Sequence, residues 1–194
     1  LTYCSLPSQL PDQIQLWSNL LRLNILGDIS ENVFISIVQC NQNLNAINVT
    51  GAHLTLSDDT LFCIAKSCVK LTALTLQASN ASDAGLRVLL QKCTNLTHLD
   101  IDWNHLTSSS STICSAIAAF GVNLVSLHIN YCHVNISDLM TIGRGCPQLQ
   151  EIVYCVCFAT DHASGAVEAL NTMFAARKIT ARCMNPTQYL SDSE

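Results

Sequence analysis

Charged residues are scarce in this sequence, and positive charge is scarcer than negative charge. Asp, Glu, Lys and Arg make up 12% of the 194 residues, with nine Lys and Arg against fourteen Asp and Glu. A nucleic-acid-binding domain needs a basic stripe or patch. The densest positive group here consists of only Arg177, Lys178 and Arg182, and the net charge is −5. We therefore expect a chain that does not bind nucleic acid.

Long apolar runs and catalytic motifs are missing as well. No stretch approaches the run of about 18 apolar residues that a membrane-spanning helix needs, so we expect no membrane span. The glycines form neither of the motifs that cradle phosphates, and the sequence contains no G-x-S-x-G or H-E-x-x-H motif. These absences predict a protein that is not an enzyme and that uses no cofactor.

Instead of such motifs, the sequence contains a repeated pattern of apolar residues. It is clearest from Cys146 to Tyr154, which reads C-P-x-L-x-x-I-x-Y, and Cys93 and Cys68 begin the same pattern. A period of 20–29 residues with this apolar spacing is typical of leucine-rich repeats. The first leucines of the six units, at intervals of 24 to 28 residues, are Leu20, Leu44, Leu71, Leu96, Leu124 and Leu149.

Each unit divides into two halves. The L-x-x-L-x-L half alternates apolar and variable residues, which predicts a short strand with one buried face. The second half begins at a polar cap, such as Ser57-Asp58-Asp59, Ser82-Asp83 or Ser137-Asp138, and continues with helical spacing. The repeat therefore predicts an α/β solenoid with parallel strands on the concave face and helices on the convex face.

The same pattern gives the expected domain limits. We expect the solenoid to span residues 1–183, with about six full repeats and a truncated first repeat. Leu1 to Cys4 resembles the tail of a strand, so we expect the chain to begin inside a repeat. Residues 184–194 are polar and acidic, which predicts a C-terminal tail outside the solenoid.

The eleven cysteines follow the repeat rather than a disulfide framework. We place Cys40 (with one extra residue), Cys68, Cys93 and Cys146 at one phase, with Val122 and Trp17 replacing the cysteine in two units. A free cysteine acts there as a small buried hydrophobe. Reduced thiols predict an intracellular protein, cytoplasmic or within an organelle assembly.

Two further patterns concern glycans and metals. Four glycosylation sequons, at Asn48, Asn80, Asn95 and Asn135, leave a secreted receptor ectodomain as an alternative. The Cys155-x-Cys157 pair has no second pair at zinc-ligand spacing, so we expect no metal there.

The G-C-P-x-L-x-x-I pattern at 145–152, with Cys132 and Cys157 after strands, resembles the cysteine-containing leucine-rich-repeat subfamily. That subfamily is typical of F-box leucine-rich-repeat proteins, and the resemblance covers residues 1–183. It implies a substrate-recognition adaptor of a ubiquitin ligase, whose F-box would precede Leu1 and whose concave repeats hold a substrate. Related repeats also occur in scaffold subunits of large assemblies, so a structural subunit is the alternative function.

The repeat frame also predicts which strand side chains face outward. Those of the later units include acids and histidines, flanked by two aromatic residues, and stacking in register should bring them together. His98, Asp100 and His128 include metal-ligand types and acid–base types, but an open sheet offers no dry pocket. Trp and Tyr are common anchors of protein interfaces, so we expect a protein partner. The predicted partner-binding patch is His98, Asp100, Asp102, Trp103, Ser126, His128, Asn130, Tyr131 and Glu151.

Overall fold

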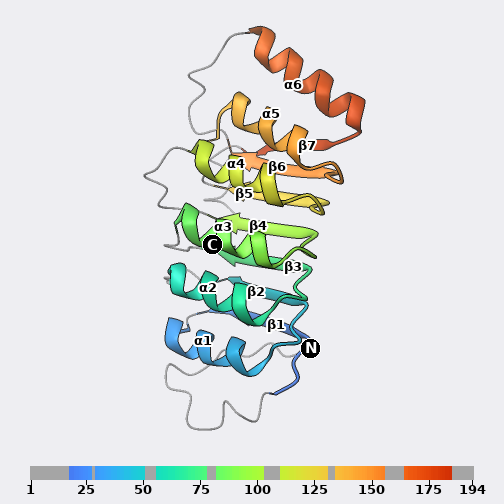
Figure 1. Cartoon of the computed structure of the whole chain (residues 1–194). Helices are drawn as coiled ribbons and strands as arrows, with labels where there is room; N and C mark the ends of the chain where they lie inside the picture. The colour runs from blue at the N-terminus through green and yellow to red at the C-terminus, as the bar shows by residue number, and fades with distance from the viewer. Residues whose placement is uncertain are drawn as a thin grey trace.

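A computed structural model describes residues 18–27, 29–50, 56–77, 82–102, 110–130, 134–155 and 164–184, which form one stack of strand–helix coils (Figure 1). The strands are β1 (Arg22–Leu26), β2 (Ala46–Thr50), β3 (Ala73–Gln77), β4 (His98–Asp102), β5 (Ser126–Asn130), β6 (Glu151–Cys155) and β7 (Thr180–Met184). The helices are α1 (Glu31–Cys40), α2 (Asp58–Ser67), α3 (Asp83–Lys92), α4 (Ser110–Phe120), α5 (Ile136–Gly145) and α6 (Ser164–Arg177).

The strands form one parallel sheet in chain order from β1 to β7. In register, Leu74 of β3 lies beside Leu99 of β4, and Leu99 lies beside Leu127 of β5. These side chains point to the buried face, because alternate residues of a strand face opposite sides of a sheet. The strand–helix solenoid predicted from the repeat frame is confirmed, and its class is that of a leucine-rich repeat.

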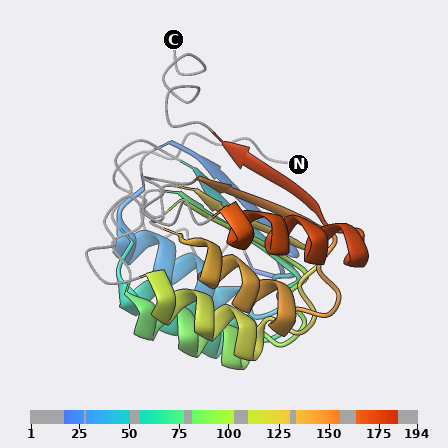
Figure 2. The same cartoon turned by 90° about the horizontal axis from the view of Figure 1, so that it is seen from above.

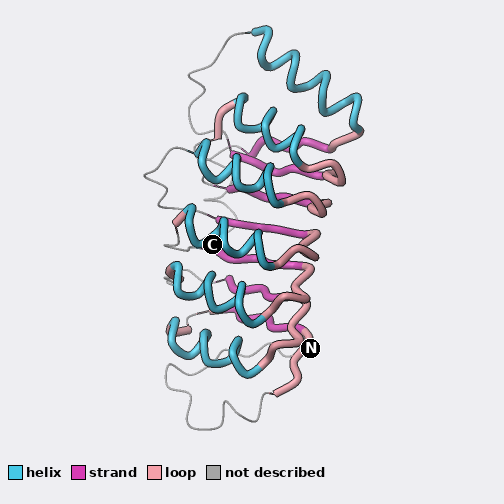
Figure 3. Tube along the Cα trace, in the orientation of Figure 1, coloured by secondary structure: helices cyan, strands magenta, loops and turns pink. Residues whose placement is uncertain are grey.

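The helices cover only one face of this sheet. Figure 2 shows α1 to α5 grouped on one side, while Figure 3 shows the strands (magenta) stacked along the other. Among the described residues no helix covers the opposite face, which we call the concave face. None of the described helices has the length and apolar character that crossing a membrane requires.

The C-x-x-L spacing has a simple origin in the turn that ends each helix. The Cys93 amide donates to the Leu89 carbonyl, which closes α3, and the Cys93 carbonyl then accepts from the Leu96 amide at 3.1 Å. Cys68 and Cys146 form the same turn with Leu71 and Leu149. Each of these thiols is buried, as expected for a cysteine that acts as a small apolar side chain.

Two assignments at this turn were wrong. Cys40 is exposed, and Asn41 occupies the buried position. The Asn41 amide group donates to the Ile37 carbonyl and its side-chain oxygen accepts from the Leu20 amide, both at 2.8 Å.

The second wrong assignment is Val122, which is exposed because Gly121 occupies the turn position instead. A Cβ at Gly121 would lie 2.6 Å from the Ile117 carbonyl oxygen and from Leu124 Cδ1. Trp17 lies outside the described residues.

The helix caps follow the predictions at two helices and differ at a third. Ser57 and Ser82 accept from the amides of Asp59 and Ala84, as expected for N-caps. In α5 the cap is Asn135 rather than Ser137, and it forms a capping box with Asp138. The helix thus begins two residues earlier than Ser137-Asp138 indicated, because asparagine caps a helix as well as serine does.

Carboxylates link the beginning of one helix to the beginning of the next. Glu31 Oε1 in α1 accepts from the Ser57 amide at 2.6 Å and from the hydroxyls of Ser57 and Thr60 at 2.7 Å. One coil later, Asp58 accepts from the Ser82 amide at 2.6 Å and from its hydroxyl at 2.7 Å. A negative charge is favourable there because helix N-termini expose free amides. Successive coils are therefore tied together at one edge.

Candidate functional site

The register of the sheet arranges the outward-facing side chains of the concave face in straight rows. The central row contains Asn24, Asn48, Thr75, Asp100, His128, Val153 and Arg182, one residue from each strand. The row beside it contains Arg22, Ala46, Ala73, His98, Ser126, Glu151 and Thr180. Polar and charged side chains therefore dominate both rows on the side of β4 and β5, whereas the second row is small at β2 and β3.

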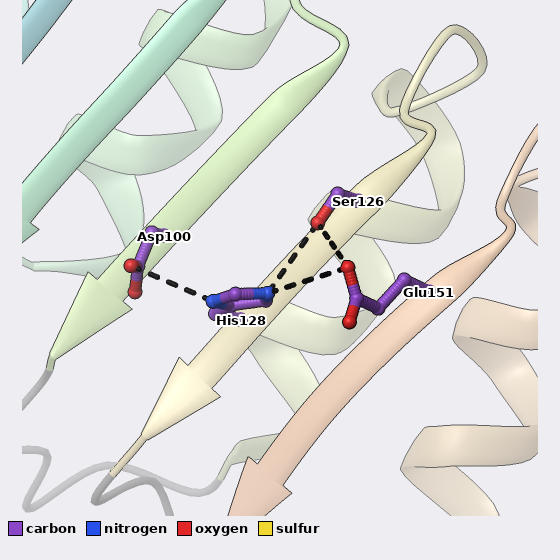
Figure 4. A network of polar contacts seen from close by, with 4 residues as sticks. All are labelled: Asp100, Ser126, His128 and Glu151. Atoms are coloured by element: carbon purple, nitrogen blue, oxygen red, sulfur yellow. Dashed lines mark hydrogen bonds and ion pairs between the residues drawn. The ribbon is translucent and has the colours of Figure 1, made fainter. Parts of the chain in front are cut away.

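His128 is the centre of a polar cluster formed by three adjacent strands (Figure 4). Its Nδ1 lies 3.6 Å from Asp100 Oδ2 on β4, and its Nε2 lies 3.9 Å from Glu151 Oε2 on β6. Ser126 Oγ lies 3.4 Å from both His128 Nε2 and Glu151 Oε2. Each of the two carboxylates therefore faces one ring nitrogen. About a third of each of these three side chains is exposed, so the cluster is open to a partner.

The protonation state of His128 sets the charge of this cluster. The Asp100 carboxylate raises the pKa of His128 above its ordinary value, partial burial opposes that rise, and Glu151 adds to it. When His128 is protonated, it offsets one of the two negative charges beside it. When it is neutral, the cluster presents two carboxylates without a neighbouring cation. The cluster therefore becomes a stronger site for positive charge as the histidine loses its proton.

Several oxygens in the central row accept no hydrogen bond within the described structure. They are Asn24 Oδ1, Asn48 Oδ1 and Asp100 Oδ1, and each of these atoms is almost inaccessible to solvent. A buried acceptor without a donor costs free energy, on the order of 1–3 kcal/mol. Native proteins pair the great majority of such atoms. These three oxygens are therefore a local cost to stability that the described residues do not offset.

The other predicted residues differ in how closely they approach this cluster. His98 is exposed on β4, in the row beside Asp100, and its Nδ1 contacts Thr97 Oγ1 at 2.9 Å. Asp102 and Asn130 pair in the backbone register, but their side chains lie outside the described part of the chain. Trp103 and Tyr131 lie outside it entirely. The structure thus unites Asp100, Ser126, His128 and Glu151, whereas His98 lies beside Ser126 in register but its ring contacts Thr97.

The described residues contain no group of three or more His, Cys, Asp or Glu side chains arranged to hold a metal ion. His98, Asp100 and His128, whose side-chain types could bind a metal, show why no such group forms. His98 contacts Thr97, whereas Asp100 and His128 face one another through a single pair of atoms. The cluster is suited to hydrogen bonds and charge recognition.

Arg182 is a feature of this face that the sequence pattern did not reveal. It lies in the central row on β7, beside Val153. Its strand reads T-A-R-C-M and lacks the leucines that mark the other units. The only available signal was alternation within 180–184, which places Thr180 and Arg182 on one face. Arg182 gives the C-terminal end of the row a positive charge.

Comparisons with known proteins give likeness in structure but not in sequence. The solved structure of Leiomodin-1 Actin-Binding Site 2 is similar, with 13% sequence identity, a TM-score of 0.45 and coverage of 86% of each chain. The leucine-rich repeat-containing protein LegL7 from Legionella pneumophila is similar at 12% identity and a TM-score of 0.39, covering 81% of this chain and 71% of that one. No protein-family model and no curated protein sequence matches. Likenesses at this level say nothing about function.

Proposed function

We propose that the protein is a non-catalytic interaction module whose concave face binds a segment of a protein partner. The observation that supports this proposal most directly is the cluster around His128, in which the Asp100 and Glu151 side chains are each about a third exposed on the face that the described helices leave uncovered. A partner that lies across this face can contact both carboxylates.

The cluster around His128 favours a positively charged side chain of that partner. Asp100 and Glu151 lie on either side of the imidazole, and each of the two side chains is about a third exposed. A lysine ammonium or arginine guanidinium that reaches this position gains charge-assisted hydrogen bonds, which are roughly twice as strong as neutral ones. The concave face therefore offers one specific cation position.

The resemblance to cysteine-containing leucine-rich repeats suggests a more specific role. Under this proposal the concave face holds the substrate of a ubiquitin ligase, and an F-box elsewhere in the protein docks onto the ligase. The turn positions of Cys68, Cys93 and Cys146 support the resemblance, because they form the same buried helix end in three coils. Co-purification of the full-length protein with a ligase adaptor, followed by ubiquitin transfer to the bound partner, tests this role. A stable complex without transfer would instead favour a scaffold subunit.

The binding face is tested by comparing two charge-matched double variants. The first, Asp100→Asn with Glu151→Gln, alters the concave cluster. The second, Asp59→Asn with Glu168→Gln, removes the same two charge types from exposed helix positions. Partners are captured from an extract of the source cells, cross-linked and mapped by mass spectrometry.

We expect cross-links to the strands and about tenfold weaker recovery with the concave variant only, since a hydrogen bond to a charged group contributes about 1.5–3 kcal/mol. The helix-face variant should recover partners as the wild type does. Cross-links confined to the helices, or equal recovery with both variants, would contradict the proposal.

A further inference from the structure

A groove of about 420 Å³ opens between α5 and α6, away from the concave cluster. Figure 1 shows that α6 (orange) is inclined relative to α5, whereas α1 to α5 run nearly side by side. The lining residues are Met140, Gly143, Arg144, Pro147, Met173 and Arg177. Its walls are therefore apolar, with two arginines.

The floor of the groove depends on a close approach at Gly143. A Cβ at this position would lie 2.3 Å from Met173 Cε and 3.1 Å from Phe174 Cε1. Phe174 of α6 is buried, while Met140 and Met173 are only partly buried. The absence of a side chain at Gly143 thus lets Met173 lie against α5. Methionine is flexible and polarizable, and it adapts to varied apolar ligands at binding surfaces.

The two arginines differ in how their charge is used. Arg177 Nη2 donates to the Cys146 carbonyl at 2.6 Å, so it satisfies the C-terminal end of α5. Arg144 is exposed in the last turn of α5, and no carboxylate of the described residues pairs with it or with Arg177. A cation in the last turn of a helix also interacts favourably with the helix dipole. That role does not require an apolar groove beside the cation. Here the unpaired charge lies at the mouth of an apolar groove.

We propose that this groove binds an acidic peptide segment of a protein partner, with an apolar side chain seated between Met140 and Met173. A carboxylate of the segment pairs with Arg144, whose planar guanidinium favours bidentate contact with a carboxylate. A second carboxylate reaches the outer nitrogen atoms of Arg177. Charge complementarity selects the acidic segment, because a basic segment would meet two arginines. This surface is distinct from the concave face, so each can fail experimentally without the other.

The test uses a random 12-residue peptide library displayed on phage and panned on the full chain. The variant Arg144→Glu reverses the charge at the groove. Its matched control is Lys66→Glu, because Lys66 is the penultimate residue of the ten-residue α2 as Arg144 is of the ten-residue α5. Arg144→Lys keeps the charge but loses the planar fork, and circular dichroism checks that all three variants are folded.

We expect the enriched peptides to combine Asp or Glu with one large apolar residue. Their affinity should fall about tenfold on Arg144→Glu, fall less on Arg144→Lys and stay unchanged on Lys66→Glu, because ion pairs at an interface depend on the particular partner. Peptides without acids, no enrichment, or equal losses on Arg144→Glu and Lys66→Glu would each overturn the proposal.

Discussion

Asp58 and Ser82 join two neighbouring coils through paired hydrogen bonds at the beginnings of their helices. The two oxygens of Asp58 accept from the amide and the hydroxyl of Ser82. The same hydroxyl caps α3 by accepting from the Ala84 amide. Gly85 leaves room for this arrangement, because a Cβ there would lie 2.4 Å from Asp58 Oδ1. A helix that begins with an acid thus organises the beginning of the next helix.

Replacing Glu31, which has the same role one coil earlier, should destabilise the fold. Glu31→Gln removes a charged acceptor of three hydrogen bonds, so we expect the free energy of unfolding to fall by about 1–3 kcal/mol. Urea denaturation at pH 7 measures the loss. Asp59→Asn is the control, because Asp59 is an exposed first-turn acid of α2. Equal losses in the two variants would mean that the link between coils contributes nothing.

The Glu31 effect should also depend on pH. Burial alone raises the pKa of Glu31, but hydrogen bonds from Thr60 and Ser57 outweigh burial and leave the pKa below its ordinary value. A carboxyl group with a lowered folded-state pKa stabilises the fold above its unfolded-state pKa, and this contribution is lost as the pH falls through the folded-state value. The difference between wild type and Glu31→Gln should therefore shrink below about pH 4.5. A difference that stays constant down to pH 3 would contradict this explanation.

Leu99 should be among the most sensitive positions of the core. It is 1% exposed in the middle strand of the sheet, between Leu74 and Leu127. Leu99→Ala should cost about 2–5 kcal/mol, because it removes buried methyl groups and leaves a cavity. Val69→Ala, at an exposed turn position, is the control. A urea midpoint for Leu99→Ala that hardly differs from the wild-type value would show that the repeat frame is misplaced.

The cysteines should react with thiol reagents in an order set by burial. Burial raises the pKa of Cys68 to about 12 and the pKa of Cys93 and Cys146 to about 11. The thiolate is the reactive form, so these buried thiols should resist iodoacetamide at pH 8 until the chain unfolds. Cys40 and Cys183 are exposed and should be modified before these three. Peptide mapping by mass spectrometry gives the rates, and modification of Cys93 as fast as Cys40 would contradict the buried turn.

The strands and most helices were predictable because each coil repeats the same physical demands. Alternation places one face of every strand in the core, and serine before an acid marks the beginnings of α2 and α3. The turn residues were harder, because different chemistry fills the same space. Asn41 satisfies backbone groups with its amide, and Gly121 avoids a clash by having no side chain.

The candidate site was predictable only in its centre. The repeat frame places Asp100, Ser126, His128 and Glu151 on one face, and the register then brings their polar atoms together. The groove between α5 and α6 was not predictable, since it depends on the inclination of α6 rather than on any spacing within a unit. Arg144 has the same position in its helix as Lys66, and sequence alone does not distinguish them.

Binding at the concave face should strengthen as the pH rises through the pKa of His128. The Asp100 carboxylate raises that pKa above its ordinary value of 6.5, with Glu151 adding to the rise, so the change should fall at a higher pH than for an ordinary histidine. Below this pH the protonated ring competes with the partner's cation for the two carboxylates. Above it the ring is neutral and the carboxylates are free to bind the cation. The measurement is the affinity of the captured partner from pH 6 to pH 8.5 at constant ionic strength.

Two histidine variants distinguish the titration of His128 from a general dependence of binding on pH. His128→Gln removes the competing proton, so its binding should lack the pH step and match the high-pH affinity of the wild type. His98→Gln changes an exposed histidine one row away and should keep the step. Arg182 is the other charged residue of the central row in this part of the sheet. Affinity that instead weakens with rising pH would show that the partner presents an acid, since protonated His128 would then be the attractive group.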